Sequence, residues 1–133
     1  MALLIWEENY SVGINKFDVQ HKKMFNLINR FFDLMKEHAE ISNLEEILNE
    51  LIEYGKNHLK EEEETFDKFD YPDKIKHKNS HDMYRKRVNK FLEEKDKVFL
   101  SFDVIDFLED WWLGHIVSAD KKYTKFLNEK GLF

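Results

Sequence analysis

Apolar residues recur at spacings of three and four along most of this chain, which is the pattern of helices that bury one face. The pattern predicts four helices, at about residues 18–40, 43–66, 73–95 and 101–128. Residues 1–17 do not show it and form a predicted N-terminal arm. Long helices with short connections are typical of a bundle in which neighbouring helices run antiparallel.

Residues that favour helix ends mark most of these boundaries. Asp18 is suited to cap the first helix, and Ser42 with Glu45 three residues later forms a capping box at the start of the second. Pro72 disfavours helix at the residue before it, so the second helix should end before this point. Ser101 is the predicted cap of the fourth helix.

The turn-forming residues agree with an all-helical protein. The chain has one proline and four glycines among 133 residues, too few for the many turns of a β-protein. Its 12 phenylalanines supply ample apolar volume for one core. We therefore predict a single domain over residues 1–133, an all-α antiparallel up-down-up-down four-helix bundle with an N-terminal arm.

Composition excludes several classes of protein. The formal charge of −6 disfavours a nucleic-acid partner, and the absence of cysteine excludes disulfides and thiolate metal sites. No apolar run approaches the length of a membrane-spanning helix. The N-terminal sequence MALLIWEENY has no basic flank and does not resemble a signal peptide. We expect a cytoplasmic monomer without membrane insertion.

Histidines and two carboxylates recur at one height of the predicted bundle. His58 and Glu62 are four residues apart, as are His77 and His81, and positions four apart lie on one face of a helix. Counted from the three helix joints, these residues and three others lie mostly within about one helical turn of each other. The seven that converge are His21, His58, Glu62, His77, His81, His115 and Asp120. A lone helical histidine is usually exposed or part of the core, as we expect for His38, but this convergence indicates a metal site.

One pair has an irregular spacing. His115 and Asp120 are five residues apart, which rotates them by about 140° on a regular helix. A π-bulge would return both side chains to one face, and such bulges are frequent at functional sites. The sequence therefore predicts a local widening of the fourth helix over residues 114–120.

Two runs of charge have simpler explanations. The acidic run 61–64 would ordinarily be a solvated face, and we expect this of Glu61, Glu63 and Glu64; only Glu62 is distinguished, by its spacing from His58. The basic run 74–87 could be mistaken for a nucleic-acid patch, but its histidines face away from most of its lysines.

The donor set suits a pair of metals. Five imidazoles and two carboxylates are too many for one tetrahedral zinc, but they suit two first-row metals bridged by the carboxylates. Nitrogen and oxygen donors without sulfur are compatible with iron, manganese or copper. With one bridging oxygen, one coordination position stays open. The spacings do not reproduce the Glu-x-x-His motifs of ferritin-like bundles.

Four segments resemble the metal-binding motifs of the hemerythrin family. They are FDVQHKK (17–23), NHLKEEE (57–63), HKNSH (77–81) and WWLGHIVSAD (111–120). The opening IWEENYSVGINKFDVQH resembles the arm of the bacterial branch, the bacteriohemerythrins. The resemblance implies two non-heme irons bridged by Glu62, Asp120 and an oxo or hydroxo group. His77, His81 and His115 would complete one iron, and His21 and His58 would hold the other, which keeps the vacancy.

The same resemblance implies reversible dioxygen binding rather than enzymatic turnover. Dioxygen would be held as hydroperoxide on the open iron, for carriage, storage or delivery to an oxygen-consuming enzyme. The expected pocket walls are Met24, Phe25, Leu59, Trp111, Trp112 and Ile116. Trp112 stands where we expect a smaller aliphatic residue from the family, and it would narrow the pocket. The alternatives are a di-iron redox enzyme that reduces peroxide or nitric oxide or oxidises iron, and an oxygen or redox sensor.

Overall fold

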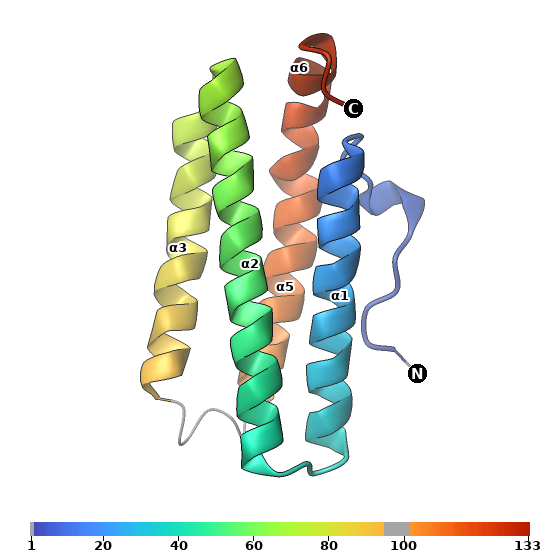
Figure 1. Ribbon diagram of the computed structural model, residues 1–133, viewed down its shortest axis with the longest axis vertical. Helices are drawn as coiled ribbons and strands as arrows, with labels where there is room; N and C mark the ends of the chain where they lie inside the picture. The colour runs from blue at the N-terminus through green and yellow to red at the C-terminus, as the bar shows by residue number, and fades with distance from the viewer. Residues whose placement is uncertain (1, 95–101) are drawn as a thin grey trace.

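Four long helices lie side by side and alternate in direction in the computed structural model, which describes residues 2–94 and 102–133 (Figure 1). They are α1 (Asn15–Lys36), α2 (Ile41–Phe69), α3 (Lys74–Glu93) and α5 (Asp103–Ser118). The last is followed by the short helices η2 (Asp120–Tyr123) and α6 (Thr124–Glu129), and the arm contains η1 (Glu8–Tyr10). The predicted all-α four-helix bundle is confirmed. No described helix is long and apolar enough to cross a membrane.

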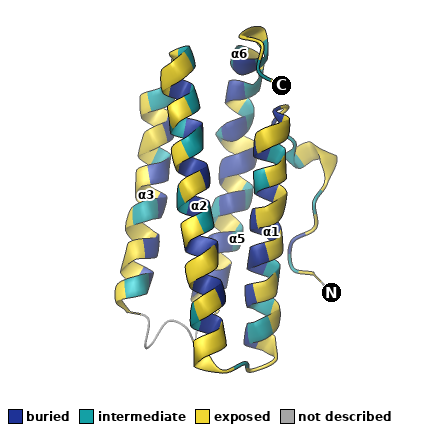
Figure 2. Ribbon diagram, viewed as in Figure 1, coloured by how far each residue is buried: buried dark blue, intermediate teal, exposed yellow. Residues whose placement is uncertain are grey.

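Most of the apolar positions that predicted the helices are buried in the bundle, although Val19, Ile75 and Met83 are exposed (Figure 2). The buried apolar residues of α1 are Phe17, Met24, Phe25, Leu27, Ile28, Phe31 and Met35. Those of α2 include Leu44, Ile47, Leu48, Leu51 and Ile52, so both helices turn one continuous stripe inward. Burial of these side chains is the main source of stability, at about 25 cal/mol for each Å² removed from water.

The first helix begins three residues before its predicted cap. The residue preceding α1 is Ile14, which has no side-chain cap, so the prediction that Asp18 caps the helix is wrong. The Asp18 carboxylate instead accepts hydrogen bonds from the Ser11 hydroxyl at 2.6 Å and from the Val12 amide at 2.8 Å. It therefore fastens the arm to the first turn of the helix.

The same helix ends at Lys36, four residues earlier than predicted. His38 adopts a left-handed conformation with φ of 54°, and the Ala39 amide bonds back to the Leu34 carbonyl at 3.0 Å. This is a Schellman-type helix end, in which residues that tolerate positive φ are favoured. His38 is exposed there and far along the helix from His21, as expected for the histidine outside the cluster.

The ends of the second and third helices also differ from the predictions. The capping box of Ser42 and Glu45 is wrong, because α2 begins at Ile41 and the Glu40 that precedes it makes no side-chain cap. The helix continues to Phe69, beyond the predicted 66, and stops where Asp70 takes a left-handed conformation. α3 begins at Lys74, one residue after the predicted start, and ends at Glu93. Residue 95 and the predicted cap at residue 101 lie outside the described residues.

The fourth helix breaks between the two residues with irregular spacing. α5 stops at Ser118, Ala119 has φ of −100° and ψ of −51°, and Asp120 opens the tighter helix η2. The predicted π-bulge is therefore wrong. The chain narrows into a 3₁₀ turn after a break, and this change of path brings Asp120 back to the side of His115.

The arm packs along α1 and reaches the last helix. The Asn29 side chain exchanges two hydrogen bonds with the backbone of Leu4, at 2.7 and 2.8 Å. At its other end, the Val12 carbonyl accepts a hydrogen bond from the Thr124 hydroxyl at 2.5 Å. Gly13 has φ of 71°, and a Cβ there would lie 2.6 Å from the Thr124 methyl carbon, so this close approach requires glycine.

Candidate metal centre

Seven buried polar side chains meet at one level of the bundle, and they come from all four long helices and from η2. α1 supplies His21, α2 supplies His58 and Glu62, α3 supplies His77 and His81, α5 supplies His115, and η2 supplies Asp120. None is more than 5% exposed. These are the seven residues that the sequence singled out.

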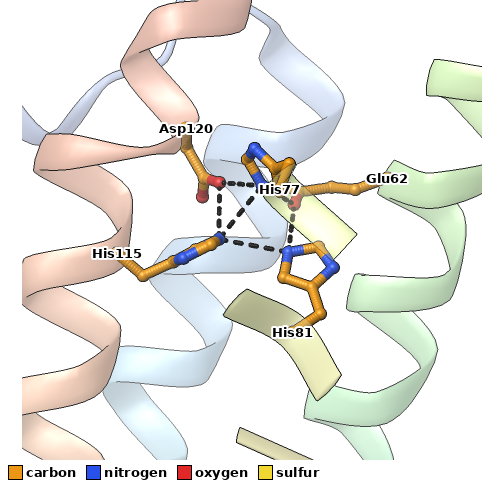
Figure 3. A group of neighbouring side chains, drawn as sticks. All are labelled: Glu62, His77, His81, His115 and Asp120. Carbon is orange, nitrogen blue, oxygen red and sulfur yellow. Dashed lines mark hydrogen bonds and ion pairs between the residues drawn. The ribbon is translucent and has the colours of Figure 1, made fainter. Parts of the chain in front are cut away.

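Three imidazoles and two carboxylate oxygens form one compact group (Figure 3). We call His77, His81 and His115 the three-imidazole set. The Nε2 atom of His115 lies 3.1 Å from those of both His77 and His81. Asp120 Oδ1 lies 2.9 Å from Nε2 of His77 and of His115, and Glu62 Oε1 lies 3.2 Å from Nε2 of His81.

A second group lies on the other side of the same carboxylates. We call His21 and His58 the two-imidazole set, and their Nε2 atoms are 3.0 Å apart. Asp120 Oδ2 lies 3.2 Å from His21 Nε2, and Glu62 Oε2 lies 3.2 Å from His58 Nε2. Each carboxylate thus directs one oxygen to each set.

These distances fit two metal ions. An octahedral ion with ligands at about 2.1 Å places neighbouring ligand atoms about 3 Å apart. Within each group the ligand atoms all lie within 4.8 Å of one another, so one ion could contact all of them. A carboxylate with one oxygen in each group would then bridge the two ions.

The hydrogen bonding of the cluster also favours metal. Glu62 Oε1 and both oxygens of Asp120 are buried without a hydrogen-bond partner among the described residues. The Nε2 atoms of His77 and His81 both lie 3.1 Å from that of His115, which in a neutral ring carries one proton or one lone pair and so cannot pair well with both. Metal ions would satisfy the lone pairs of the imidazoles and of the carboxylates together, so the residues present fit a metal pair.

Charge within the cluster keeps its carboxylates ionised. Burial alone raises the pKa of Glu62, but the neighbouring His58, His77 and His81 outweigh this and lower that pKa well below its usual range. Asp120 behaves in the same way, because His115 and His21 offset both its burial and the nearby Glu62 charge. Burial alone lowers the pKa of His77, yet its contacts with Asp120 and Glu62 raise it to about 9. The two ionised carboxylates therefore make the cluster favourable for positive charge.

Residues outside the seven-residue cluster orient its imidazoles through hydrogen bonds, and the sequence analysis did not predict them. Glu63 accepts a hydrogen bond from His81 Nδ1 at 2.7 Å and another from the Arg85 guanidinium at 2.6 Å. Gln20 Oε1 accepts from His58 Nδ1 at 2.5 Å, and its amide nitrogen donates to Glu61. The expectation of a solvated face is therefore wrong for Glu63, whereas Glu61 is 40% exposed and also pairs with Lys16. Glu64, which is 65% exposed and pairs with Lys60, matches the expectation.

Two further hydroxyl groups contact the cluster. Ser80 Oγ lies 3.0 Å from His115 Nδ1, and Tyr123 donates to Glu62 Oε2 at 2.8 Å. Burial, helped by the charges of Glu62 and Asp120, raises the pKa of Tyr123 well above its ordinary value, so this phenol stays protonated as a donor. Ser80 could have been predicted as a neighbour of the cluster from its position between His77 and His81 in the sequence. No feature of the sequence predicted the contact of Tyr123.

The six expected pocket residues are not all in one place. Trp112 lies near both members of the two-imidazole set, with ring centroids 5.8 Å from His58 and 6.5 Å from His21. Trp111 instead stacks on His115 of the three-imidazole set, at 4.4 Å and 10°. Phe25 packs against the arm, with its ring 5.5 Å from Trp6. Met24, Leu59 and Ile116 are fully buried, and the Met24 methyl lies close to Gly55, which adjoins Trp112.

Sequence comparison places this cluster in a known family. The family model described as "Hemerythrin HHE cation binding domain" matches residues 12–127, a range that includes all seven cluster residues. The chain belongs to the hemerythrin family. Hemerythrins bind non-heme iron, which agrees with a donor set of nitrogen and oxygen.

Relatives match this hemerythrin over nearly its whole length. A bacteriohemerythrin of Clostridium acetobutylicum is 30% identical over 129 residues, which cover 91% of this chain and 98% of the relative. A hemerythrin-like protein of Naegleria gruberi is 33% identical and is covered to 92%, as is this chain. A crystal structure of wild-type hemerythrin aligns with a TM-score of 0.84 and 30% identity, covering 93% of this chain and 97% of the other.

Proposed function

We propose that this hemerythrin binds dioxygen reversibly at a non-heme di-iron centre, for carriage, storage or delivery to an oxygen-consuming enzyme. The observation that carries the proposal is the division of the cluster. Each carboxylate directs one oxygen to each set of imidazoles, and one set has three imidazoles while the other has two. Such an arrangement leaves the second metal with room for an exogenous ligand.

The seven residues have distinct roles in this proposal. The three-imidazole set would hold one iron, the two-imidazole set would hold the other, and Glu62 and Asp120 would bridge them. When bound, the iron pair supplies the electrons that dioxygen takes up on binding and returns on release. Neutral imidazoles in place of further carboxylates keep the anionic charge low, which favours the reduced pair.

The apolar surroundings support reversible binding rather than turnover. Trp112 is fully buried and faces both His21 and His58, and Leu59 follows His58 directly on α2 with none of its surface exposed. Side chains of this kind exclude water and protons, which would otherwise promote irreversible loss of electrons from the pair. We expect Leu59→Ala to retain iron and to oxidise faster in air.

An optical experiment tests the proposal. Metal-free protein is loaded with ferrous iron without air, exposed to oxygen and then flushed with argon, while visible spectra and iron content are recorded. An absorption band that appears with oxygen and disappears with argon, at two irons per chain, is the expected result. A band that argon cannot reverse, together with steady consumption of peroxide or nitric oxide, would instead support a redox enzyme.

Two variants serve as controls for that experiment. His77→Ala removes a ligand close to both carboxylates and should abolish the band together with di-iron loading. Glu64→Gln changes an exposed carboxylate two residues from Glu62 and should leave both unchanged.

A further inference from the structure

We infer that the two metal positions differ in affinity and fill in order. The position of the three-imidazole set fills first and tightly, and that of the two-imidazole set fills last and exchanges. The protein therefore passes through a stable form with one metal, which does not bind oxygen. This inference rests on the proposed di-iron site, and it goes further by assigning unequal roles to the residues around it.

The first asymmetry lies among the atoms that would touch the metals. One group offers three imidazole nitrogens and two carboxylate oxygens, whereas the other offers two imidazole nitrogens and the remaining two oxygens. Because the carboxylates are shared, the difference between the positions is one whole imidazole. An ion in the second position must complete its coordination with solvent or an exogenous ligand, and such ligands are easily exchanged.

The second asymmetry lies in the charge behind the imidazoles of the first position. His81 is hydrogen-bonded through Nδ1 to the carboxylate of Glu63 at 2.7 Å. Glu63 also forms an ion pair with Arg85, so the group that accepts from His81 is a carboxylate and not a neutral amide. A carboxylate behind a ligating histidine fixes the ring orientation and makes the other nitrogen a stronger donor. Arg85 holds Glu63 in place at 2.6 Å.

The imidazoles of the second position have weaker support. His58 Nδ1 contacts the neutral amide oxygen of Gln20 at 2.5 Å, so no charge increases its donor strength. His21 Nδ1 is buried and has no hydrogen-bond partner among the residues that the structure describes. No described residue therefore fixes the tautomer of His21 in the way that Glu63 fixes that of His81.

The bridging carboxylate itself is unequal. The Tyr123 hydroxyl donates a hydrogen bond at 2.8 Å to Glu62 Oε2, the oxygen nearest to His58. Glu62 Oε1, which faces His77 and His81, receives no such hydrogen bond. A donated proton competes with a metal for the electron density of Oε2, so Tyr123 weakens the bridge on the two-imidazole side. All three asymmetries act in the same direction.

Stepwise binding of a single probe metal tests the inference. Metal-free protein is titrated with Co²⁺ in a calorimeter, and the loaded protein is then exposed to a chelator while metal per chain is followed. We expect two resolved binding steps, and we expect the chelator to remove one metal well before the other. Two indistinguishable steps with two metals bound would overturn the inference and leave the proposed function intact, whereas no uptake would overturn both.

Matched variants assign each step to a position. Glu63→Gln removes the charge behind His81 and should weaken the first step by about 10- to 100-fold, the usual effect of losing an outer partner. The double variant Gln20→Glu/Glu61→Gln exchanges an amide and a carboxylate without changing net charge, and it should strengthen the second step. Tyr123→Phe should also strengthen the second step, because the remaining ring keeps its contacts with Phe17 and Phe66 and still holds η2 in place. If Glu63→Gln instead weakened only the second step, the assignment would be wrong; circular dichroism of each variant establishes that it is folded.

Discussion

Two segments each supply one imidazole and one carboxylate to the centre, and they do so in different ways. On α2, His58 and Glu62 are four residues apart on a continuous helix, so the helix alone aligns them. His115 and Asp120 are five residues apart, and α5 ends between them at Ser118. Both pairs nevertheless place a nitrogen and an oxygen close together, at 3.2 and 2.9 Å. A site therefore constrains where atoms lie, and different backbones can satisfy it.

The break between His115 and Asp120 is stabilised by contacts with other helices. η2 is held by Tyr123, whose hydroxyl bonds to Glu62 on α2 and whose ring packs 5.9 Å from that of Phe17 on α1. α2 needs no such support, because its own hydrogen bonds continue for two turns beyond Glu62. Contacts with other helices thus determine the path of the chain after Ala119.

Removal of either shared carboxylate gives the largest expected effect. Glu62→Gln and Asp120→Asn each keep the side-chain shape but lose the charge that both proposed metal positions would share. We expect the iron retained after anaerobic loading and desalting to fall from two ions per chain to about one or fewer, since a lost ligand weakens both positions at once. Elemental analysis measures it.

The pair of variants also tests whether the two segments are equivalent. Equal losses would show that the helix break delivers Asp120 as effectively as the regular helix delivers Glu62. Retention of two irons by Asp120→Asn would contradict a bridging role for Asp120. Glu64→Gln, an exposed neighbour on α2, is the control that should keep two.

Spacing made the seven central residues predictable, but not the residues that support them. A distance of four along a helix fixes a common face, and distances from the joints fix a common height, so His58, Glu62, His77 and His81 could be placed without coordinates. Glu63 could not, because its partner Arg85 is 22 residues away and an acidic run is usually solvated.

The way in which α5 ends between His115 and Asp120 could not be predicted from the sequence either. Ala119 favours helix, so no local signal marks the end of α5 there. A spacing of five showed that a regular helix would fail between His115 and Asp120, and this part of the expectation was sound. The choice between a widened turn and a break followed by a 3₁₀ turn depends on long-range contacts such as that of Tyr123 with Glu62, and the sequence pattern does not show these.

Gly55 on α2 allows this helix to pack closely against Trp112 of α5. It lies on α2 three residues before His58, and a Cβ there would lie 3.1 Å from Trp112 Cζ2 and 3.3 Å from the Tyr84 hydroxyl. Gly55→Ala should lower the free energy of unfolding of the metal-free protein by about 1–2 kcal/mol, because overpacking outweighs the gain in helix propensity. Urea denaturation followed by circular dichroism measures this.

The same Gly55→Ala substitution in a Trp112→Leu protein tests whether the contact with Trp112 causes the loss of stability. Trp112→Leu removes the ring that the new methyl group would meet, so Gly55→Ala should be nearly neutral in the Trp112→Leu protein. The coupling between the two substitutions should exceed about 0.5 kcal/mol, as for residues in direct contact. Additive effects would show that the alanine is harmful for another reason.

Gly114 on α5 is the counterpart of Gly55 and should respond in the opposite direction. It is exposed, directly precedes His115, and has no atom within 4 Å of the position that a Cβ would take. Gly114→Ala should therefore raise the free energy of unfolding by about 0.5–1 kcal/mol through helix propensity alone, with two irons still bound. The same denaturation and elemental analysis measure both quantities. If stability rose while iron was lost, α5 would need the flexibility of glycine to let the chain break at Ala119, and the two segments would differ in stiffness as well as in path.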